Sequence, residues 1–204
     1  MKYLLTIIIS FAIGTIGFAD QLLNQVKTKY DKITTIQGNF TQTICSDQTG
    51  TCQQFEGKFS ITRPYFSRLE VTSPEKQTIV TDSQYVYIYL VDKKKVYLQQ
   101  ADAGINFFKI FDMFLNEPEH YTITDKDSLH TVFAYKKDSL ESSTVINDLT
   151  LSVNNYTKLI EQFSFTDMTD TEMKFDLTNI KTNVKLSDKT FRLVIPKDVE
   201  LIQY

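Results

Sequence analysis

Hydrophobic residues are spaced differently at the start of this chain and along the rest of it. Between positions 20 and 33 they recur every three or four residues, which predicts one amphipathic helix over 20–32. The residues at this spacing are Leu22, Leu23, Val26, Tyr30 and Ile33. From Thr35 onward the period changes to two, which is the spacing of strands with one buried face.

Runs with the period of a strand continue almost to the C-terminus, separated by short polar turns. The predicted strands are 39–45, 52–62, 65–72, 76–81, 84–92, 95–100, 121–124, 130–136, 148–153, 158–166, 171–178 and 190–195. Gaps this short favour antiparallel pairing, because a parallel crossover needs a dozen or more residues. A sheet of about eleven strands must curl, since open sheets of this size rarely stay flat.

A second helix is predicted in the middle of the chain, over 107–116. Its apolar residues follow three- and four-residue steps, and Pro118 indicates an end near Asn116. The residues at these steps are Phe107, Ile110, Phe111, Phe114 and Leu115. With two or three short helices that do not alternate with strands, the fold class is mainly β (α+β) and not doubly wound α/β.

The two cysteines lie in one predicted hairpin, whose polar turn contains Gly50. A symmetric hairpin places Cys45 opposite Cys52 on the more polar face. The four apolar side chains of the other face are Phe40, Ile44, Phe55 and Phe59. An even number of cysteines in a secreted chain predicts a disulfide. From the entropy of closing the loop, this disulfide is expected to stabilise the fold by about 2–3 kcal/mol. A redox-active pair is disfavoured because the Cys-x-x-Cys spacing is missing.

The N-terminus has the features of a secretory signal peptide. Lys2 precedes an uncharged, mostly apolar run over 4–18, and Gly17 and Ala19 form a small-x-small cleavage site. We therefore expect a signal peptide at 1–19, cleaved after Ala19, and one mature domain over 20–204. An uncleaved N-terminal anchor is the alternative, although the run is short for a membrane span.

Composition excludes some classes of function and favours others. With 22 basic and 25 acidic residues the chain has a net charge of −3, which argues against nucleic-acid binding. Its two histidines, His120 and His130, sit in no triad or metal-ligand spacing, so we expect no catalytic residue, metal or cofactor. The 15 Phe and 11 Tyr imply much aromatic surface that is buried or offered to an apolar ligand.

Two predicted strands, 84–92 and 158–166, are apolar on both faces and so need cover on both sides. One interpretation is a curled sheet with an ordinary aromatic core. The other is a half-barrel whose concave face forms a cavity, with 107–115 as its lid. The residues expected to line that cavity or lid are Phe40, Phe59, Tyr87, Tyr89, Phe107, Ile110, Phe111, Phe114, Leu115, Phe163 and Phe165.

Several short motifs occur in a defined order along the chain. They are Gly38-x-Phe40-x-Gln42, Gly57-x-Phe59, Arg63-Pro64 with Arg68 and Glu70, Gln77-x-Ile79-Val80-x-Asp82, Tyr85-x-Tyr87-x-Tyr89, and Phe191-x-Leu193-x-Ile195-Pro196. Together they resemble the periplasmic outer-membrane lipoprotein carrier family (LolA-like). This resemblance implies an incomplete, strongly curved antiparallel β-barrel of eleven strands, with helices covering its concave face.

The resemblance also implies a function and partners. It implies a monomeric periplasmic chaperone that accepts acylated lipoproteins from an inner-membrane ABC exporter and delivers them to an outer-membrane receptor, where one exists. A periplasmic lipid- or glycolipid-binding module, or a sensor of lipoproteins, is the alternative. Arg63 is then expected to contact the lid and help hold the closed state, unless it is a surface arginine paired with Glu70 or a neighbouring acid.

Overall fold

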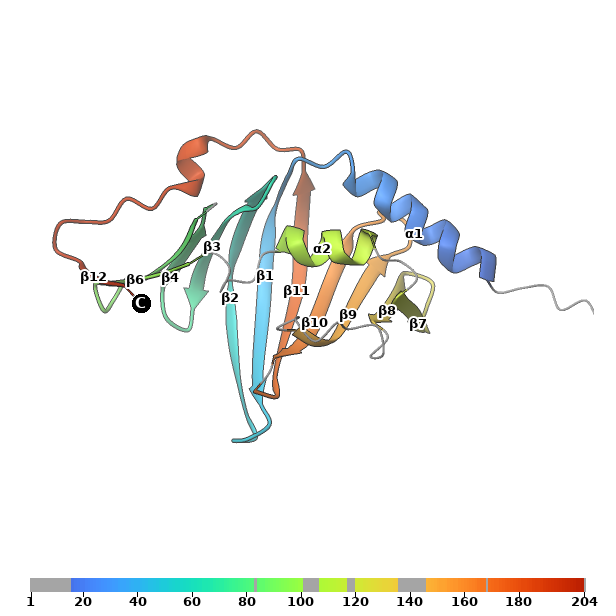
Figure 1. Ribbon diagram of the computed structural model, residues 1–204, viewed down its shortest axis with the longest axis horizontal. Helices are drawn as coiled ribbons and strands as arrows, with labels where there is room; N and C mark the ends of the chain where they lie inside the picture. The colour runs from blue at the N-terminus through green and yellow to red at the C-terminus, as the bar shows by residue number, and fades with distance from the viewer. Residues whose placement is uncertain are drawn as a thin grey trace, which may run out of the picture.

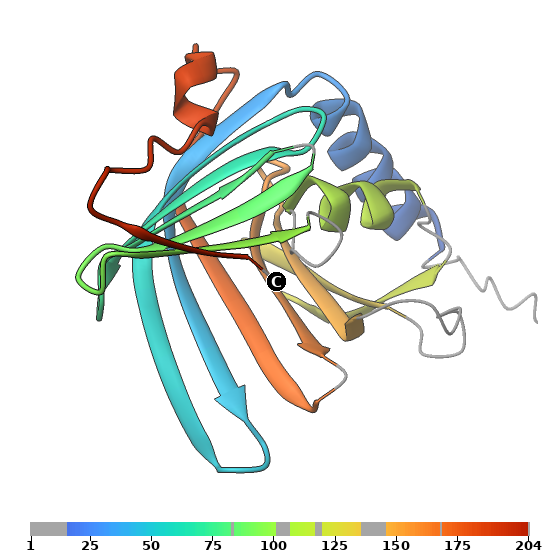
Figure 2. The same cartoon turned by 60° about the vertical axis from the view of Figure 1, so that its left-hand side comes forward.

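A computed structural model describes residues 16–82, 84–100, 107–116, 120–135, 146–167 and 169–203. These residues form one sheet of twelve strands with the order β12-β6-β5-β4-β3-β2-β1-β11-β10-β9-β8-β7. The sheet curves strongly and its two edges, β12 and β7, stay unjoined (Figures 1 and 2). The predicted incomplete barrel is therefore confirmed, with twelve strands where about eleven were expected.

The elements follow one another in a nearly continuous meander. The helices are α1 (Ile16–Tyr30), α2 (Phe107–Asn116) and the short 3₁₀ helix η4 (Asp188–Phe191). The strands are β1 (Thr35–Ser46), β2 (Thr51–Thr62), β3 (Phe66–Ser73), β4 (Gln77–Thr81), β5 (Tyr85–Leu90), β6 (Lys95–Gln100), β7 (Tyr121–Lys126), β8 (His130–Tyr135), β9 (Ile146–Asn154), β10 (Ile160–Asp167), β11 (Thr171–Thr182) and β12 (Glu200–Gln203). Both predicted helices are present, although α1 begins inside the expected signal peptide, of which 1–15 lie outside the described residues.

The β1–β2 hairpin has the predicted register and explains two of the sequence motifs. Cys45 pairs with Cys52, and the two are joined by a disulfide. Phe40 pairs with Gly57, and Phe59 pairs with Gly38. A Cβ atom on Gly57 would lie 2.9 Å from the Phe40 ring, and one on Gly38 would lie 2.9 Å from the Phe59 ring. Each phenylalanine thus covers the glycine opposite, and a carbonyl oxygen of the other neighbouring strand lies closer still, so a side chain does not fit there.

The main core lies between the concave face of the sheet and the two α-helices. In Figure 1, α2 lies across β1, β11 and β10, with α1 beside it. We call the side of the sheet that meets α2 the inner face. The largest fully buried side chains there include Tyr30, Phe59, Phe111 and Phe163. Burial of these aromatic side chains and their aliphatic neighbours supplies most of the driving force for folding.

The predicted strand at 190–195 is wrong. The chain forms η4, whose N-cap Ser187 accepts a hydrogen bond from the Lys189 N–H, and then continues without strand pairing until β12. Leu193 is half-buried whereas Val194 is 85% exposed. An extended segment with one side against the protein therefore shows the same alternation of apolar and polar residues as a strand, without being paired as one. The four-residue β12 was missed, and it pairs with β6 in parallel, not antiparallel.

The C-terminal segment lies against the outer face of the sheet. Phe191 packs on Phe66 with ring centroids 6.3 Å apart, and the Thr190 carbonyl accepts a hydrogen bond from Arg68. Phe66 and Arg68 belong to β3. The next strand, β4, contributes the fully buried Val80. The expected cover on both sides of the sheet therefore comes from two different parts of the chain.

Candidate functional site

Helix α2 carries an apolar face into the concavity of the sheet. Among its side chains that the structure describes, six are buried: Phe107, Phe108, Ile110, Phe111, Phe114 and Leu115. Lys109 and Asn116 are exposed, so polar residues occupy the opposite side of the helix. This three- and four-residue spacing is the physical reason why the segment forms a helix and buries this face.

The first turn of α2 sits in a cluster of four aromatic rings. The ring of Phe107 lies 5.8 Å from Phe59, 5.0 Å from Phe163 and 5.1 Å from Phe175, all edge to face. Phe163 and Phe175 are themselves stacked at 4.7 Å across the β10–β11 pair. Because these contacts fill the space beneath the helix, a ligand can enter here only if α2 moves.

The rest of α2 contacts α1 and the β8–β10 region. The Phe111 ring lies 5.6 Å from Tyr30 of α1, and Phe114 lies 5.3 Å from Phe133 of β8. The buried Tyr30 hydroxyl accepts a hydrogen bond from the Ile160 N–H at 3.0 Å. Burial raises the pKa of Tyr30 far above its ordinary value, so this hydroxyl stays neutral. Tyr30 therefore connects α1, α2 and the sheet.

Arg63 binds α2 from the turn after β2. Its two terminal nitrogens, Nη1 and Nη2, donate to the two carboxylate oxygens of Asp112, each at 2.9 Å. Its Nε donates to the Ile33 carbonyl at 3.2 Å, and its guanidinium lies 4.6 Å from the centre of the Phe108 ring. The Asp112 carboxylate raises the pKa of Arg63 above its ordinary value. This bidentate geometry holds α2 to the sheet and to the segment before β1.

These contacts bear on the two roles considered for Arg63: its acidic partner is Asp112, which belongs to the helix expected to be the lid. The alternative partner Glu70 is bound instead by Arg68, at 2.8 Å. Arg63 contacts the expected lid through the carboxylate of Asp112. Sequence reasoning missed Asp112, although it is the only acidic residue of the helix and could have been noticed for that reason.

A second polar contact holds the C-terminal end of α2. Lys27 of α1 donates from Nζ to the Leu115 carbonyl at 3.2 Å and to the Asn116 side-chain oxygen at 3.1 Å. A cation at this position satisfies a carbonyl that has no partner within the helix and interacts favourably with the helix dipole. Helix α2 is thus held by polar contacts at two points along its length.

Nine of the eleven residues expected to line the interior lie together in one buried cluster. They are Phe40, Phe59, Phe107, Ile110, Phe111, Phe114, Leu115, Phe163 and Phe165. The cluster also contains Phe175 and Tyr30, which were not proposed. The alternation of 171–178 already placed Phe175 on an apolar face, but no local signal showed that this face is the inner one.

The structure does not bring Tyr87 and Tyr89 to this cluster. The register pairs Phe59 with Leu69, Leu69 with Ile79, and Ile79 with Ile88, so the inner face of β5 carries the residues between the tyrosines. Tyr87 and Tyr89 therefore lie on the outer face. A strand that is apolar on both faces does not reveal which face is concave.

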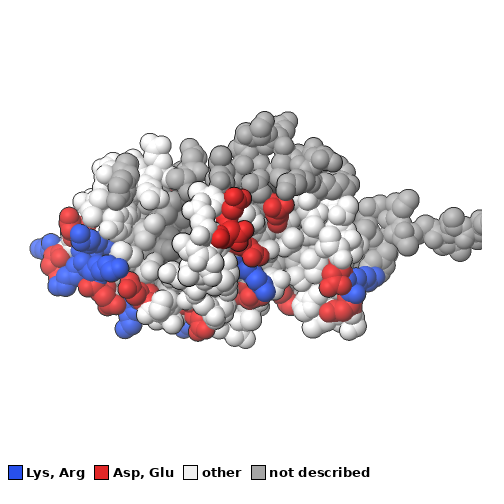
Figure 3. All heavy atoms as spheres, turned by 90° about the horizontal axis from the view of Figure 1, so that it is seen from below, with Lys and Arg blue, Asp and Glu red and all other residues white. Residues whose placement is uncertain are grey.

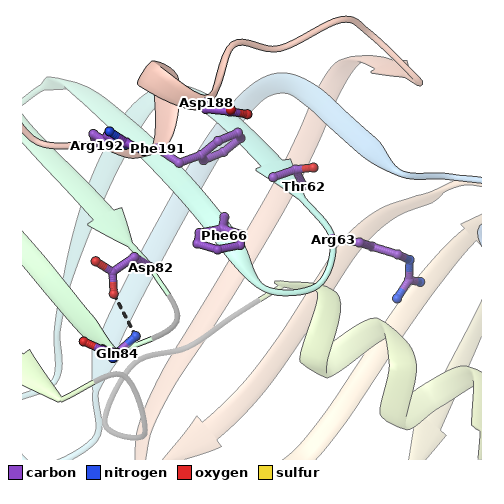
Figure 4. A pocket seen from close by; sticks show the side chains of 8 residues that line it. All are labelled: Thr62, Arg63, Phe66, Asp82, Gln84, Asp188, Phe191 and Arg192. Atoms are coloured by element: carbon purple, nitrogen blue, oxygen red, sulfur yellow. Dashed lines mark hydrogen bonds between the residues drawn. The ribbon is translucent and has the colours of Figure 1, made fainter.

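A separate cavity of about 450 Å³ lies at the rim of the sheet, beside η4 (Figure 4). It combines acidic, basic and aromatic side chains. Its lining residues are Thr62, Arg63, Phe66, Asp82, Gln84, Asp188, Phe191 and Arg192. Figure 4 shows the Arg63 side chain turned away from the others and towards α2. This cavity is therefore distinct from the aromatic interior.

Surface charges of both signs are mixed, and some of them are paired. Lys93, Lys94 and Lys95, in and beside the β5–β6 turn, form ion pairs with Glu75, Asp198 and Glu200 respectively. In Figure 3 blue and red atoms lie side by side on the face seen from below. Across the described residues, no helix has the length and apolar content needed to cross a membrane.

Comparison with known proteins agrees with this geometry. A family model described as "Outer membrane lipoprotein carrier protein LolA" matches residues 31–194. The chain belongs to the LolA family. Two outer-membrane lipoprotein carrier proteins are similar to it: one from Haemophilus ducreyi is 24% identical over 98% of this chain and 93% of its own length. The other, from Francisella tularensis subsp. novicida, is 25% identical over 98% of this chain and 96% of its own length.

A solved structure supports the fold independently of sequence. An uncharacterized conserved protein from Thermus thermophilus superposes with a TM-score of 0.57, covering 91% of this chain and 99% of that one. Its sequence identity is only 12%, so the likeness concerns the fold alone.

Proposed function

We propose that this protein is a periplasmic chaperone that accepts lipoproteins released from the inner membrane and delivers them to the outer membrane. It shields their acyl chains against the inner face of the sheet after α2 moves aside. The observation that carries the proposal is a helix with six buried apolar side chains, held by a partly exposed ion pair and by the hydrogen bonds of Lys27. Such a helix covers an apolar surface and can be displaced from it.

Magnitudes support a reversible exchange between α2 and an acyl chain. Transfer of a 16-carbon chain from water to an apolar site is favourable by on the order of 10 kcal/mol, at about 0.8 kcal/mol per CH₂. Exposure of the six buried side chains of α2 costs a gross energy of the same order, at about 2 kcal/mol each. The two terms nearly offset each other, so the carrier can both bind its cargo and release it.

The polar contacts of α2 set the closed state without making it permanent. The Arg63 and Asp112 side chains are 32% and 21% exposed, so water screens their attraction. A pair of this kind contributes about 1 kcal/mol. Opening therefore depends mainly on whether a ligand replaces the aromatic contacts of Phe107 and its neighbours.

The proposal includes the route and the partners of the chain. The signal peptide at 1–19 directs export and is cleaved after Ala19, which leaves a monomeric domain over 20–204. An inner-membrane ABC exporter supplies the acylated lipoprotein, and an outer-membrane receptor accepts it where one exists. We assign no catalytic residue and no cofactor, because the work is binding and release.

The proposal is tested with spheroplasts and a carrier whose α2 can be locked. Purified carrier is expected to release lipoproteins from spheroplasts, and native mass spectrometry is expected to detect the carrier with its acylated cargo. For the locked form, Arg63→Cys and Asp112→Cys are combined and bridged with a short bis-maleimide. We expect the bridged protein to bind no cargo.

The matched control is the same double variant without the bridge. It carries both substitutions and is expected to load cargo, because only the covalent bridge prevents α2 from moving. Equal cargo release by bridged and unbridged protein, or no cargo on the wild-type carrier, contradicts the proposed function.

A further inference from the structure

The β1–β2 hairpin projects beyond the rest of the sheet (Figures 1 and 2). Strand β2 pairs with β1 from Thr51 onward, but its pairing with β3 begins only at Glu56. Residues 51–55 therefore form a strand edge with a partner on one side only. We call this segment the free edge.

The main-chain groups that point outward from the free edge can be identified. The Cα atoms of Cys45 and Cys52 are 4.1 Å apart, the spacing of a non-hydrogen-bonded antiparallel pair. The N–H and C=O of Cys52, and by alternation those of Gln54, therefore turn away from β1. Glu56 follows the same alternation, and its carbonyl accepts a hydrogen bond from Thr72 of β3 at 3.1 Å. Within the described chain, no hydrogen bond is made to the outward N–H and C=O groups of Cys52 or Gln54.

The free edge lacks three common devices that prevent strand addition. Exposed edges commonly carry lysine, proline or a bulge. Residues 51–55 read TCQQF and contain neither a charge nor a proline, and the bulge of β2 comes later, between Glu56 and Gly57. The disulfide between Cys45 and Cys52 holds the edge next to β1. The free edge is therefore a preformed template for one more β-strand.

We infer that the free edge binds, as an added strand, the polypeptide segment that follows the acylated residue of the cargo. This inference rests on the proposed function. The inner face of the hairpin continues from the aromatic interior: Phe40 and Phe59 lie beneath α2, and Phe55 packs at the margin of the same cluster. Arg63 and Asp112 close the opposite end of the hairpin. Acyl chains that enter the interior from the Phe55 end of the hairpin leave the peptide beside the free edge.

The small size of the free edge favours a tethered occupant. Two outward residues offer only a few main-chain hydrogen bonds, each with a modest net contribution. A separate partner, or a second copy of the chain, would have to offset the full cost of association with these bonds alone. A segment already held through its acyl chains binds as part of the same molecule and avoids that cost.

The test compares synthetic lipopeptides on the full-length protein. One carries a diacylated cysteine followed by a peptide tail long enough to span residues 51–55. A second carries the same diacylated cysteine without a tail, and a third has N-methyl groups at alternate tail residues, which removes the donors. We expect the plain tail to strengthen binding about tenfold, the effect of one or two hydrogen bonds. The N-methylated tail is expected to give no gain.

Substitutions at Gln54 supply the matched variants. Gln54→Pro removes one outward N–H and leaves the bonds to β1 intact, because proline is tolerated at a strand edge. Gln54→Ala removes the side chain and keeps the N–H. We expect the gain from the tail to be lost in Gln54→Pro and retained in Gln54→Ala, with equal affinity of both variants for the tail-less lipid.

The remaining outcomes separate this inference from the proposed function. Equal affinity of tailed and tail-less lipids for the wild-type protein overturns the inference and leaves acyl binding intact. Tight binding of the tail without acyl chains, or a dimer that Gln54→Pro abolishes, assigns the free edge to another partner and also overturns it. Failure to bind the tail-less lipid contradicts the proposed function itself.

Discussion

At the scale of single residues, Arg63 shows how one side chain joins three segments. It contacts Asp112 in α2, the Ile33 carbonyl between α1 and β1, and the face of the Phe108 ring. Lysine could not reproduce these contacts, because its single ammonium lacks the planar fork that binds both carboxylate oxygens. We therefore interpret Arg63 as the residue that favours the closed position of α2.

Replacement of Arg63 by leucine is expected to raise the affinity for a fluorescent acyl ligand about fivefold. Loss of about 1 kcal/mol from the closed state increases the fraction of open protein by that factor. The same change is expected to slow release of lipoprotein to acceptor membranes. Equilibrium titration and a transfer assay measure the two effects.

Arg68→Leu is the matched control for this prediction. Arg68, in β3, is also an arginine in an ion pair, but its partner Glu70 lies on the outer face, away from α2. Its removal is expected to leave acyl affinity unchanged. If Arg63→Leu behaves like Arg68→Leu in both assays, Arg63 has no role in closure.

At the scale of elements, the β1–β2 hairpin combines a tight inner face with a stapled tip. Near α2, Phe40 and Phe59 cover the glycines opposite, and a Cβ on Gly57 would lie 2.2 Å from the Glu70 carbonyl. At the tip, β2 is not paired with β3, and its side chains are mostly exposed. The Cys45–Cys52 bond therefore holds together the part of the hairpin that packing supports least.

Removal of this disulfide by Cys45→Ser and Cys52→Ser is expected to lower the free energy of unfolding by about 2–3 kcal/mol. The bond closes a short loop and so restricts the unfolded chain. Urea denaturation of the oxidised protein and the double variant measures the difference. Wild-type protein with the bond reduced should match the variant, and an unchanged midpoint would show that the hairpin tip needs no covalent support.

At the scale of the whole molecule, the sheet is covered on its two faces by different parts of the chain. The α-helices cover the inner face, whereas the segment from η4 to β12 returns along β3 to the β6 edge. This return buries Phe191 and extends the sheet by one parallel strand. We expect the segment to stabilise the half of the sheet that α2 does not cover.

Deletion of residues 187–203 is expected to destabilise the protein by several kcal/mol, at about 2 kcal/mol for each large apolar side chain exposed. Hydrogen exchange should accelerate most in β5 and β6 and least in β1 and β11. Val194→Asp is the control, because Val194 lies in the same segment and is 85% exposed. Uniform exchange across the sheet after deletion would refute this role.

The elements could be predicted where the signal was local. The helix at 107–116 followed from the spacing of its phenylalanines, and the pairing of Cys45 with Cys52 followed from the symmetry of one hairpin. The same reasoning failed at 190–195, because any extended segment with one buried side shows the period of a strand. It also could not place Tyr87 and Tyr89, whose strand is apolar on both faces.

The amino-acid sequence by itself determined the order of the elements from α1 to β11, the hairpin register and the apolar face of α2, because these depend on neighbouring residues and on the periods of helix and strand. Only the tertiary structure decided that Asp112 meets Arg63, that Phe175 stacks on Phe163 and that Tyr87 faces outward. Those relations join residues far apart along the chain. They depend on the curvature of the sheet and on which face it turns towards α2, which no local pattern encodes.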